Sequence, residues 1–134
     1  MEFNLKTDAE FENLASIAEF IQHSVHEFHL DRKKSFQIEL AVDEACTNII
    51  LHGYKGEKGK IHIKCVKNAR NVTVVIEDWG KSWDPESVKK PDLNADLEDR
   101  EVGGLGIHFI KTLMDEVIYH NEDGKNILIL KKSL

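Results

Sequence analysis

The sequence is poor in the residues that mark disulfide-rich, metal-binding or nucleic-acid-binding proteins. Its two cysteines, Cys46 and Cys65, lie in apolar stretches without the CxxC spacing of a metal or redox site, so we expect two buried free thiols. Lys and Arg number 18 against 24 Asp and Glu, for a formal charge of −6, and the basic residues are scattered along the chain. Without a basic stripe, the chain is not expected to bind nucleic acid directly.

Long hydrophobic runs are also absent. No apolar stretch approaches the roughly 18 residues that span a membrane, and the N-terminal residues do not combine a basic with an apolar segment as a secretory leader does. A chain of 134 residues is long enough to build one core. We therefore expect a single cytoplasmic domain over residues 1–134 that does not contact a membrane.

Proline is confined to one segment. Pro85 and Pro91 both fall within residues 80–102, where periodicity fails and a mostly acidic stretch, 92–101, carries Arg100 as its one basic residue. An unpatterned segment of this length inside a compact domain is usually functional or mobile.

Elsewhere, apolar periodicity predicts the element order β-α-α-β-β-loop-α-β-β. The expected strands cover residues 2–6, 60–67, 72–76, 116–120 and 126–131. The expected helices run from about 11 to 28, from Asp31 to about 52, and from a glycine turn at 103–106 to about 114. Thr7 or Asp8 is the expected N-cap of the first helix and Asp31 that of the second, which should end at Gly53. Because hairpins dominate this order, we expect an α/β (α+β) two-layer sandwich with a mixed, mostly antiparallel sheet and the helices on one face.

A narrow polar stripe interrupts the second predicted helix. Residues 36–52 are apolar around most of the helix circumference, which predicts a largely buried helix. Gln37, Glu44 and Asn48 nevertheless fall within an arc of roughly 40°. An unpartnered buried carboxylate is costly, so a cation, a water network or a ligand should be present. The alternative is that Glu44 and Asn48 bond to each other or to a neighbouring strand.

Two turns add possible binding chemistry. Asp78 and Gly80 end a strand, where the glycine permits a close backbone approach and the carboxylate offers a fixed acceptor; the alternative is a simple strand-ending turn. The glycine turn at 103–106 precedes a helix and would aim free N–H groups at an anion such as phosphate. A flexible helix start is the alternative there.

The order of these features resembles the GHKL ATPases, the superfamily of gyrase, histidine kinases and mismatch-repair ATPases. Residues 44–54 (EACTNIILHGY) resemble the N-box. Residues 76–80 (IEDWG), with WDP at 83–85, resemble the first glycine box of anti-sigma factor serine/threonine kinases, and residues 102–117 (VGGLGIHFIKTLMDEV) resemble their second. The resemblance covers nearly the whole chain and implies the Bergerat ATP-binding fold.

The resemblance also implies a role for each matching residue. It assigns Glu44 as the general base for a serine hydroxyl and Asn48 to Mg²⁺, an ion that favours oxygen ligands. The residues implied to hold ATP are Asp78 at the adenine amino group, Gly80 beside the base, Gly103, Gly104 and Gly106 at the phosphates, and Arg100 at the γ-phosphate. Residues from about 86 to 102 would form a lid. For Arg100 the alternative is an exposed partner of Asp96 or Glu101.

By the same resemblance, the chain is an ATP-binding anti-sigma regulatory factor with serine/threonine kinase activity. Its implied partners are a STAS-type anti-anti-sigma protein, which it phosphorylates, and a sigma factor, which it sequesters. The resemblance also implies a homodimer. Two alternatives remain open: a non-catalytic ATP-binding interaction module, and an ATP hydrolase in which Glu44 activates water.

Several positions depart from the family pattern or suggest other sites. Ser82 replaces a glycine, Trp79 stands where a polar residue is common, and Lys125 and Asn126 follow Gly124 where Thr is frequent. We expect Trp79 and Trp83 to pack in the core or at its rim. Three-residue steps drift around a helix and no fourth ligand is evident, so His23, His26 and His29 are expected on the surface rather than at a metal.

Overall fold

A computed structural model describes residues 1–82 and 104–134. Five strands form one sheet in the order β1-β2-β3-β5-β4. Their bounds are Glu2–Asp8 (β1), Lys60–Lys67 (β2), Asn71–Asp78 (β3), Glu116–Glu122 (β4) and Lys125–Ser133 (β5). The expected, mostly antiparallel sheet is confirmed, and each of the four pairings between the described strands is antiparallel.

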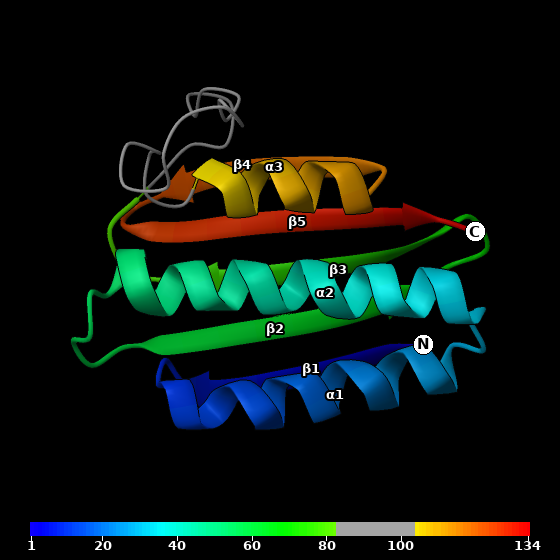
Figure 1. The fold of residues 1–134 in the computed structure, drawn as a ribbon, viewed down its shortest axis with the longest axis horizontal. Helices are drawn as coiled ribbons and strands as arrows, with labels where there is room; N and C mark the ends of the chain where they lie inside the picture. The colour runs from blue at the N-terminus through cyan, green and yellow to red at the C-terminus, as the bar shows by residue number, and fades with distance from the viewer. Residues whose placement is uncertain (83–103) are drawn as a thin grey trace.

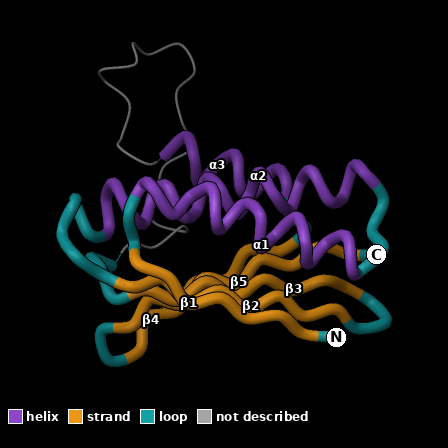
Figure 2. Tube along the Cα trace, turned by 90° about the horizontal axis from the view of Figure 1, so that it is seen from below, coloured by secondary structure: helices purple, strands orange, loops and turns teal. Residues whose placement is uncertain are grey.

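Three helices cover one face of this sheet. They are α1 (Leu14–Glu27), α2 (Arg32–Asn48) and α3 (Gly104–Leu113), with a 3-10 turn, η1 (Phe11–Asn13), before α1 and a π-helical turn, η2 (Ile49–Gly53), after α2. Figure 1 shows the helices running along the strands, and Figure 2 shows them together in a layer on one side. The expected two-layer α/β architecture is therefore confirmed.

The core lies between the two layers. Strand residues that face the helices are buried in alternation, as in the pattern of β3, where Val72, Val74 and Ile76 are 0% exposed. Both cysteines are buried free thiols, as predicted. Burial raises the pKa of the Cys65 thiol to about 12, so this thiol stays protonated and packs as a small apolar group.

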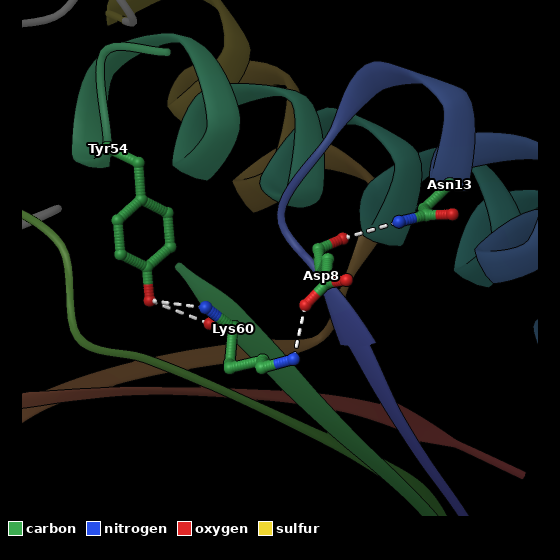
Figure 3. Close-up of polar contacts among 4 residues, drawn as sticks. All are labelled: Asp8, Asn13, Tyr54 and Lys60. Atoms are coloured by element: carbon green, nitrogen blue, oxygen red, sulfur yellow. Dashed lines mark hydrogen bonds and ion pairs between the residues drawn. The ribbon is translucent and has the colours of Figure 1, made fainter. Parts of the chain in front are cut away.

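The predicted N-caps have different outcomes. Asp31 caps α2 as expected, since its Oδ1 accepts a hydrogen bond from the Lys34 amide at 2.7 Å. The prediction of Thr7 or Asp8 as the cap of the first helix is wrong, because β1 continues through Asp8 and the chain then forms η1. The Asp8 carboxylate pairs with the Lys60 ammonium, and the Asp8 carbonyl accepts from Asn13 Nδ2 at 2.9 Å (Figure 3).

The second helical run ends at Gly53, as predicted. Its last turn is the π-helical turn η2, and the left-handed residues that follow are Lys55 (φ 53°) and Gly56 (φ 82°) rather than Gly53 itself. The helix is also less buried than expected, since Phe36 is 60% exposed and Leu51 44%. Its buried side faces the sheet, so α2 has one apolar face rather than being buried all round.

Lysines from the sheet hold the C-terminal ends of two helices. Lys67 Nζ, at the end of β2, donates to the carbonyl of Phe28 at the end of α1, and Lys132 Nζ, in β5, donates to the carbonyl of Leu113 at the end of α3. Both distances are 2.7 Å. A cation at this position satisfies a free carbonyl and complements the negative end of the helix dipole.

Two expectations about the helices can be assessed in the described residues. His23, His26 and His29 are all exposed, which confirms their surface position, and residues 1–82 and 104–134 contain no cluster of potential metal ligands. Among the described helices, none has the length and apolar character needed to cross a membrane.

Candidate functional site

The end of α2, the end of β3 and the start of β5 meet at one end of the sheet. Asp78 is the last residue of β3 and lies between Ile61 of β2 and Asn126 of β5. A Cβ atom built on Gly53, at the end of η2, would lie 3.8 Å from Asp78 Oδ1. The fold therefore brings the end of η2 and the strand-ending Asp78 together.

Asp78 is a buried carboxylate with one engaged oxygen. The residue is 3% exposed. Its Oδ1 accepts hydrogen bonds from the Gly80 amide at 2.9 Å and from Asn126 Nδ2 at 3.0 Å, whereas no described residue donates to Oδ2. Burial raises the pKa of this carboxyl above its ordinary value, and the two hydrogen bonds oppose that rise. Oδ2 is thus an acceptor available to a ligand.

Gly80 lies against the backbone of Gly53. A Cβ atom on Gly80 would come within 2.7 Å of the Gly53 carbonyl carbon and 2.8 Å of its oxygen. The next residue, Lys81, donates its amide to the same Gly53 carbonyl at 2.8 Å. Only glycine at position 80 allows this approach, so a close backbone contact is present, and its partner is Gly53.

Tyr54 connects three segments around the site. Its hydroxyl accepts from the Trp79 amide at 2.8 Å. The same hydroxyl accepts from the Lys60 amide at 3.2 Å and donates to the Lys60 carbonyl at 2.7 Å (Figure 3). A Cβ atom on Gly59 would lie 2.1 Å from the ring, so the ring needs a glycine there. Tyr54 lies in the motif at residues 44–54, but its role could not be predicted from the sequence, because its three bonds join residues far apart in the chain.

The ring of Trp79 packs at the rim, as predicted. It is 44% exposed and meets the His62 ring edge-on, with 4.8 Å between centroids. Trp83 lies outside the described residues. Trp79 therefore contributes its backbone amide to the Tyr54 hydroxyl, while its side chain packs on β2.

Asn126 is the polar residue that sequence reasoning left without a role. It is 1% exposed. Its Nδ2 donates to Asp78 Oδ1 and to the Gly80 carbonyl, both at 3.0 Å, and its Oδ1 accepts from the Tyr119 hydroxyl at 2.7 Å and from Asn121 Nδ2 at 2.8 Å. The sequence did contain a signal for this residue. Asn126 alternates in step with Leu128 and Leu130, so it lies on the face of β5 that is covered by the helices.

Asn48 presents a side-chain amide that the described residues do not use. The residue is 9% exposed, and Nδ2 is buried without a hydrogen-bond partner. The alternative in which this amide donates to Glu44 or to a strand is therefore wrong. Glu44, one helical turn earlier, is half-buried. A buried amide nitrogen without a partner is costly in a native structure and points to a missing ligand or water.

The thiol of the neighbouring Cys46 is buried and lies near the charges of Asp43 and Asp78. Burial, and then the charges of Asp43 and Asp78, raise the pKa of its thiol. Such a thiol stays protonated and unreactive. Cys46 is therefore a packing residue beneath the site rather than a nucleophile.

The start of α3 lies at the same end of the helical layer. Figure 1 shows the first turn of α3 (yellow), which begins at Gly104, beside the C-terminal end of α2 (green). Gly106 falls in this first turn, where backbone N–H groups and the positive end of the helix dipole favour an anion. Gly103, Arg100 and the expected lid at 86–102 lie outside the described residues.

Comparison with known proteins places these features in context. Residues 7–132 match the family model described as histidine kinase-like ATPase domain. Proteins named serine-protein kinase RsbW are 33% identical over 98 residues in Bacillus cereus and 34% identical over 99 residues in Listeria monocytogenes. Each alignment covers 70% of this chain but 61% and 63% of the relative, so the chain spans about three fifths of these relatives.

A solved structure has a similar fold. The crystal structure of the RsbU and RsbW domains of a Mycobacterium tuberculosis protein superposes with a TM-score of 0.72 at 17% identity. The match covers 98% of this chain and 32% of that one. The likeness extends over the whole sheet and its three helices.

Proposed function

We propose that this chain, which belongs to the histidine kinase-like ATPase domain family, binds ATP with Mg²⁺ and transfers the γ-phosphate to a serine or threonine of a protein substrate. The observation that carries the proposal is the buried carboxylate of Asp78, in which two donors bind Oδ1 and none of the described residues donates to Oδ2. A buried acceptor at the end of a strand fits the exocyclic amino group of adenine.

The polar end of α2 supports the Mg²⁺ part of the proposal. Mg²⁺ takes oxygen ligands and is commonly bound through one or two protein groups together with phosphates. The unpartnered atom of Asn48 is a nitrogen, but rotation of the amide by 180° exchanges nitrogen and oxygen at that position. With the amide oxygen there, Asn48 fits a metal ligand. The ion, when bound, would neutralise charge on the phosphates.

The catalytic part assigns a proton acceptor. Glu44 lies one turn before Asn48 on the same helix face and is half-buried. In the proposed reaction the substrate hydroxyl oxygen bonds to the γ-phosphorus, its proton passes to Glu44, and the bond to ADP breaks. A positioned general base typically contributes about 10²- to 10⁴-fold to such a step.

The phosphates would lie at the start of α3. We assign Gly103, Gly104 and Gly106 to phosphate binding through their backbone, and Arg100 to the γ-phosphate. The start of α3 beside the end of α2 supports this assignment (Figure 1), because a helix N-terminus favours anions.

The relatives named serine-protein kinase RsbW support the hypothesis of a protein kinase over those of an ATP hydrolase or a non-catalytic module. We propose a STAS-type anti-anti-sigma protein as the substrate and a sigma factor as the sequestered partner, with residues 1–134 acting as one cytoplasmic domain that can form a homodimer. The switch requires the nucleotide state to change the affinity for each partner.

Labelled ATP tests the reaction. The chain is incubated with [γ-³²P]ATP, Mg²⁺ and a STAS-type protein that carries the candidate serine, and nucleotide binding is measured in parallel. Glu44→Ala should lose phosphate transfer and keep ATP binding. Glu39→Ala is the matched control, because this half-buried residue of α2 lies about 140° away around the helix and should transfer phosphate normally.

The other outcomes identify the alternatives. ATP binding without transfer to any STAS-type protein would favour the non-catalytic module. Phosphate release without a partner, lost in Glu44→Ala, would favour a hydrolase. Absence of ATP binding would refute the proposal as a whole.

A further inference from the structure

The amide of Asn126 has no capacity left for a ligand. A primary amide offers two N–H donors and an oxygen with two lone pairs. In this structure Nδ2 donates to Asp78 Oδ1 and the Gly80 carbonyl, and Oδ1 accepts from the Tyr119 hydroxyl and Asn121 Nδ2. All four positions are filled by groups of the chain itself.

These partners also fix the orientation of the amide. The reversed amide would place Oδ1 against the Asp78 carboxylate and the Gly80 carbonyl, which are both acceptors. It would also turn Nδ2 toward the side-chain nitrogen of Asn121, which is a donor. Only one of the two amide orientations is compatible with this network.

We propose that Asn126 is a positioning residue, which selects adenine by aiming the Asp78 carboxylate and does not itself contact the base. The inference rests on the proposed ATP site and deepens it. Asn126 holds Oδ1 of Asp78 together with the Gly80 amide, so the carboxylate cannot rotate without breaking two hydrogen bonds. Oδ2, which receives no hydrogen bond from the residues that the structure describes, is thereby left as the acceptor for the base.

The chemistry of the bases makes this arrangement selective. Adenine presents an amino group at its 6-position, which donates to a carboxylate, whereas guanine presents a carbonyl oxygen, which a carboxylate repels. The position that follows Gly124 is frequently Thr in the resembled family; here Lys125 intervenes and Asn126 supplies two donors. The additional donor reaches the Gly80 carbonyl and ties the close-approach glycine to the same network.

A pair of nucleotides that differ only at the 6-position tests the proposal. Dissociation constants of the full chain are measured by calorimetry with Mg²⁺ and either ATP or purine riboside triphosphate, which lacks the 6-amino group. The parent should prefer ATP by about tenfold or more, because the amino group donates to a charged acceptor. Asn126→Ala should reduce this preference to within about twofold, with little change in affinity for the analogue.

The outcomes separate positioning from other roles. An unchanged preference in Asn126→Ala would overturn the proposal, and equal weakening of both nucleotides would show a merely structural role and overturn it too. Asn4→Ala, at an exposed residue of β1, should behave like the parent. A parent chain that binds neither nucleotide would refute the ATP site itself, and one that binds both equally would remove Asp78 as the reader of the base.

A measurement on the parent protein covers the case in which Asn126→Ala does not fold. The two side-chain N–H signals of Asn126, assigned by NMR, should be protected from exchange without nucleotide and nearly unmoved when ATP is added, because both protons already have acceptors. Rapid exchange, or a large shift on adding ATP but not the analogue, would show that the amide is free or meets the base, and would overturn the proposal.

Discussion

Asp78→Asn should separate nucleotide binding from stability. The Asn side chain keeps a carbonyl oxygen for the Gly80 and Asn126 donors, but its nitrogen replaces Oδ2, so a donor meets the amino group of adenine. Loss of a hydrogen bond to a charged acceptor costs about 1.5–3 kcal/mol. Binding of Mg²⁺–ATP should therefore weaken by at least about 10- to 150-fold.

The same change should not destabilise the fold at neutral pH. Burial raises the pKa of Asp78 above its value in the unfolded chain, so protonation of this carboxyl favours the folded state over the unfolded one. The stability of the parent is therefore highest below the ordinary pKa and falls as the pH rises through the raised one. At pH values above the raised pKa, each unit by which the pKa is raised costs about 1.4 kcal/mol of folding stability. The neutral Asn avoids this cost, so its advantage should grow from acidic to neutral pH.

Urea unfolding at pH 4 to 7 and calorimetric ATP titration would measure both effects. Asp123→Asn, in the exposed turn between β4 and β5, removes the same charge and should leave ATP binding unchanged. Undiminished ATP affinity in Asp78→Asn would show that Oδ2 is not the acceptor. If the stability of Asp78→Asn relative to the parent fell between pH 4 and pH 7, burial would not be destabilising this carboxylate, and the reasoning would be refuted.

Three further changes test neighbouring parts of the site. Asn48→Ala should abolish the Mg²⁺ dependence of ATP binding without loss of stability, since it removes a buried amide nitrogen that has no partner; titrations with and without chelator measure this. Gly80→Ala should destabilise the chain by about 1–3 kcal/mol or prevent folding, because its Cβ would meet the Gly53 backbone at 2.7 Å; thermal unfolding measures it. Tyr54→Phe should cost about 1–3 kcal/mol, since the Trp79 amide loses its acceptor, and chemical unfolding measures it.

Each of these predictions has a control and a contrary result. For Gly80 the control is Gly124→Ala, where φ is 82° and the space is open, so only the conformational cost of about 1 kcal/mol applies; equal losses at both sites would contradict a clash. For Tyr54, an unaltered unfolding midpoint would mean that water replaces the hydroxyl. Persistent sensitivity to chelator in Asn48→Ala would remove Asn48 from the metal site.

The parts of the fold that depend on local pattern could be predicted from the sequence. The hairpin of β2 and β3 follows from alternation on both sides of a short turn, and the Asp31 cap follows from one side chain and the amide three residues later. Alternation also predicts β4 and β5, although not their full lengths. These features depend on neighbours in the chain, which the sequence displays directly.

The parts that depend on contacts between distant segments could not be predicted. The sequence indicated that a helix ends at Gly53, and it does, but nothing in the local pattern predicted that Gly53 packs against Gly80, 27 positions later. Asn126 lies 48 residues from Asp78, so no local pattern pairs them. Family resemblance assigned residues to the site, but it did not predict the hydrogen-bond network around Asp78.

The lysine contacts at the helix ends determine where the helical layer is held. Lys67 and Lys132 stand on either side of Val72 in the sheet, whereas Asp78 and Asn126 pair six residues further along β3, about 20 Å away. Lys132 therefore holds the C-terminal end of α3 at the end of the sheet opposite Asp78 and Asn126. Substituting Lys132 would remove a contact of this helix without touching any residue proposed to bind the nucleotide.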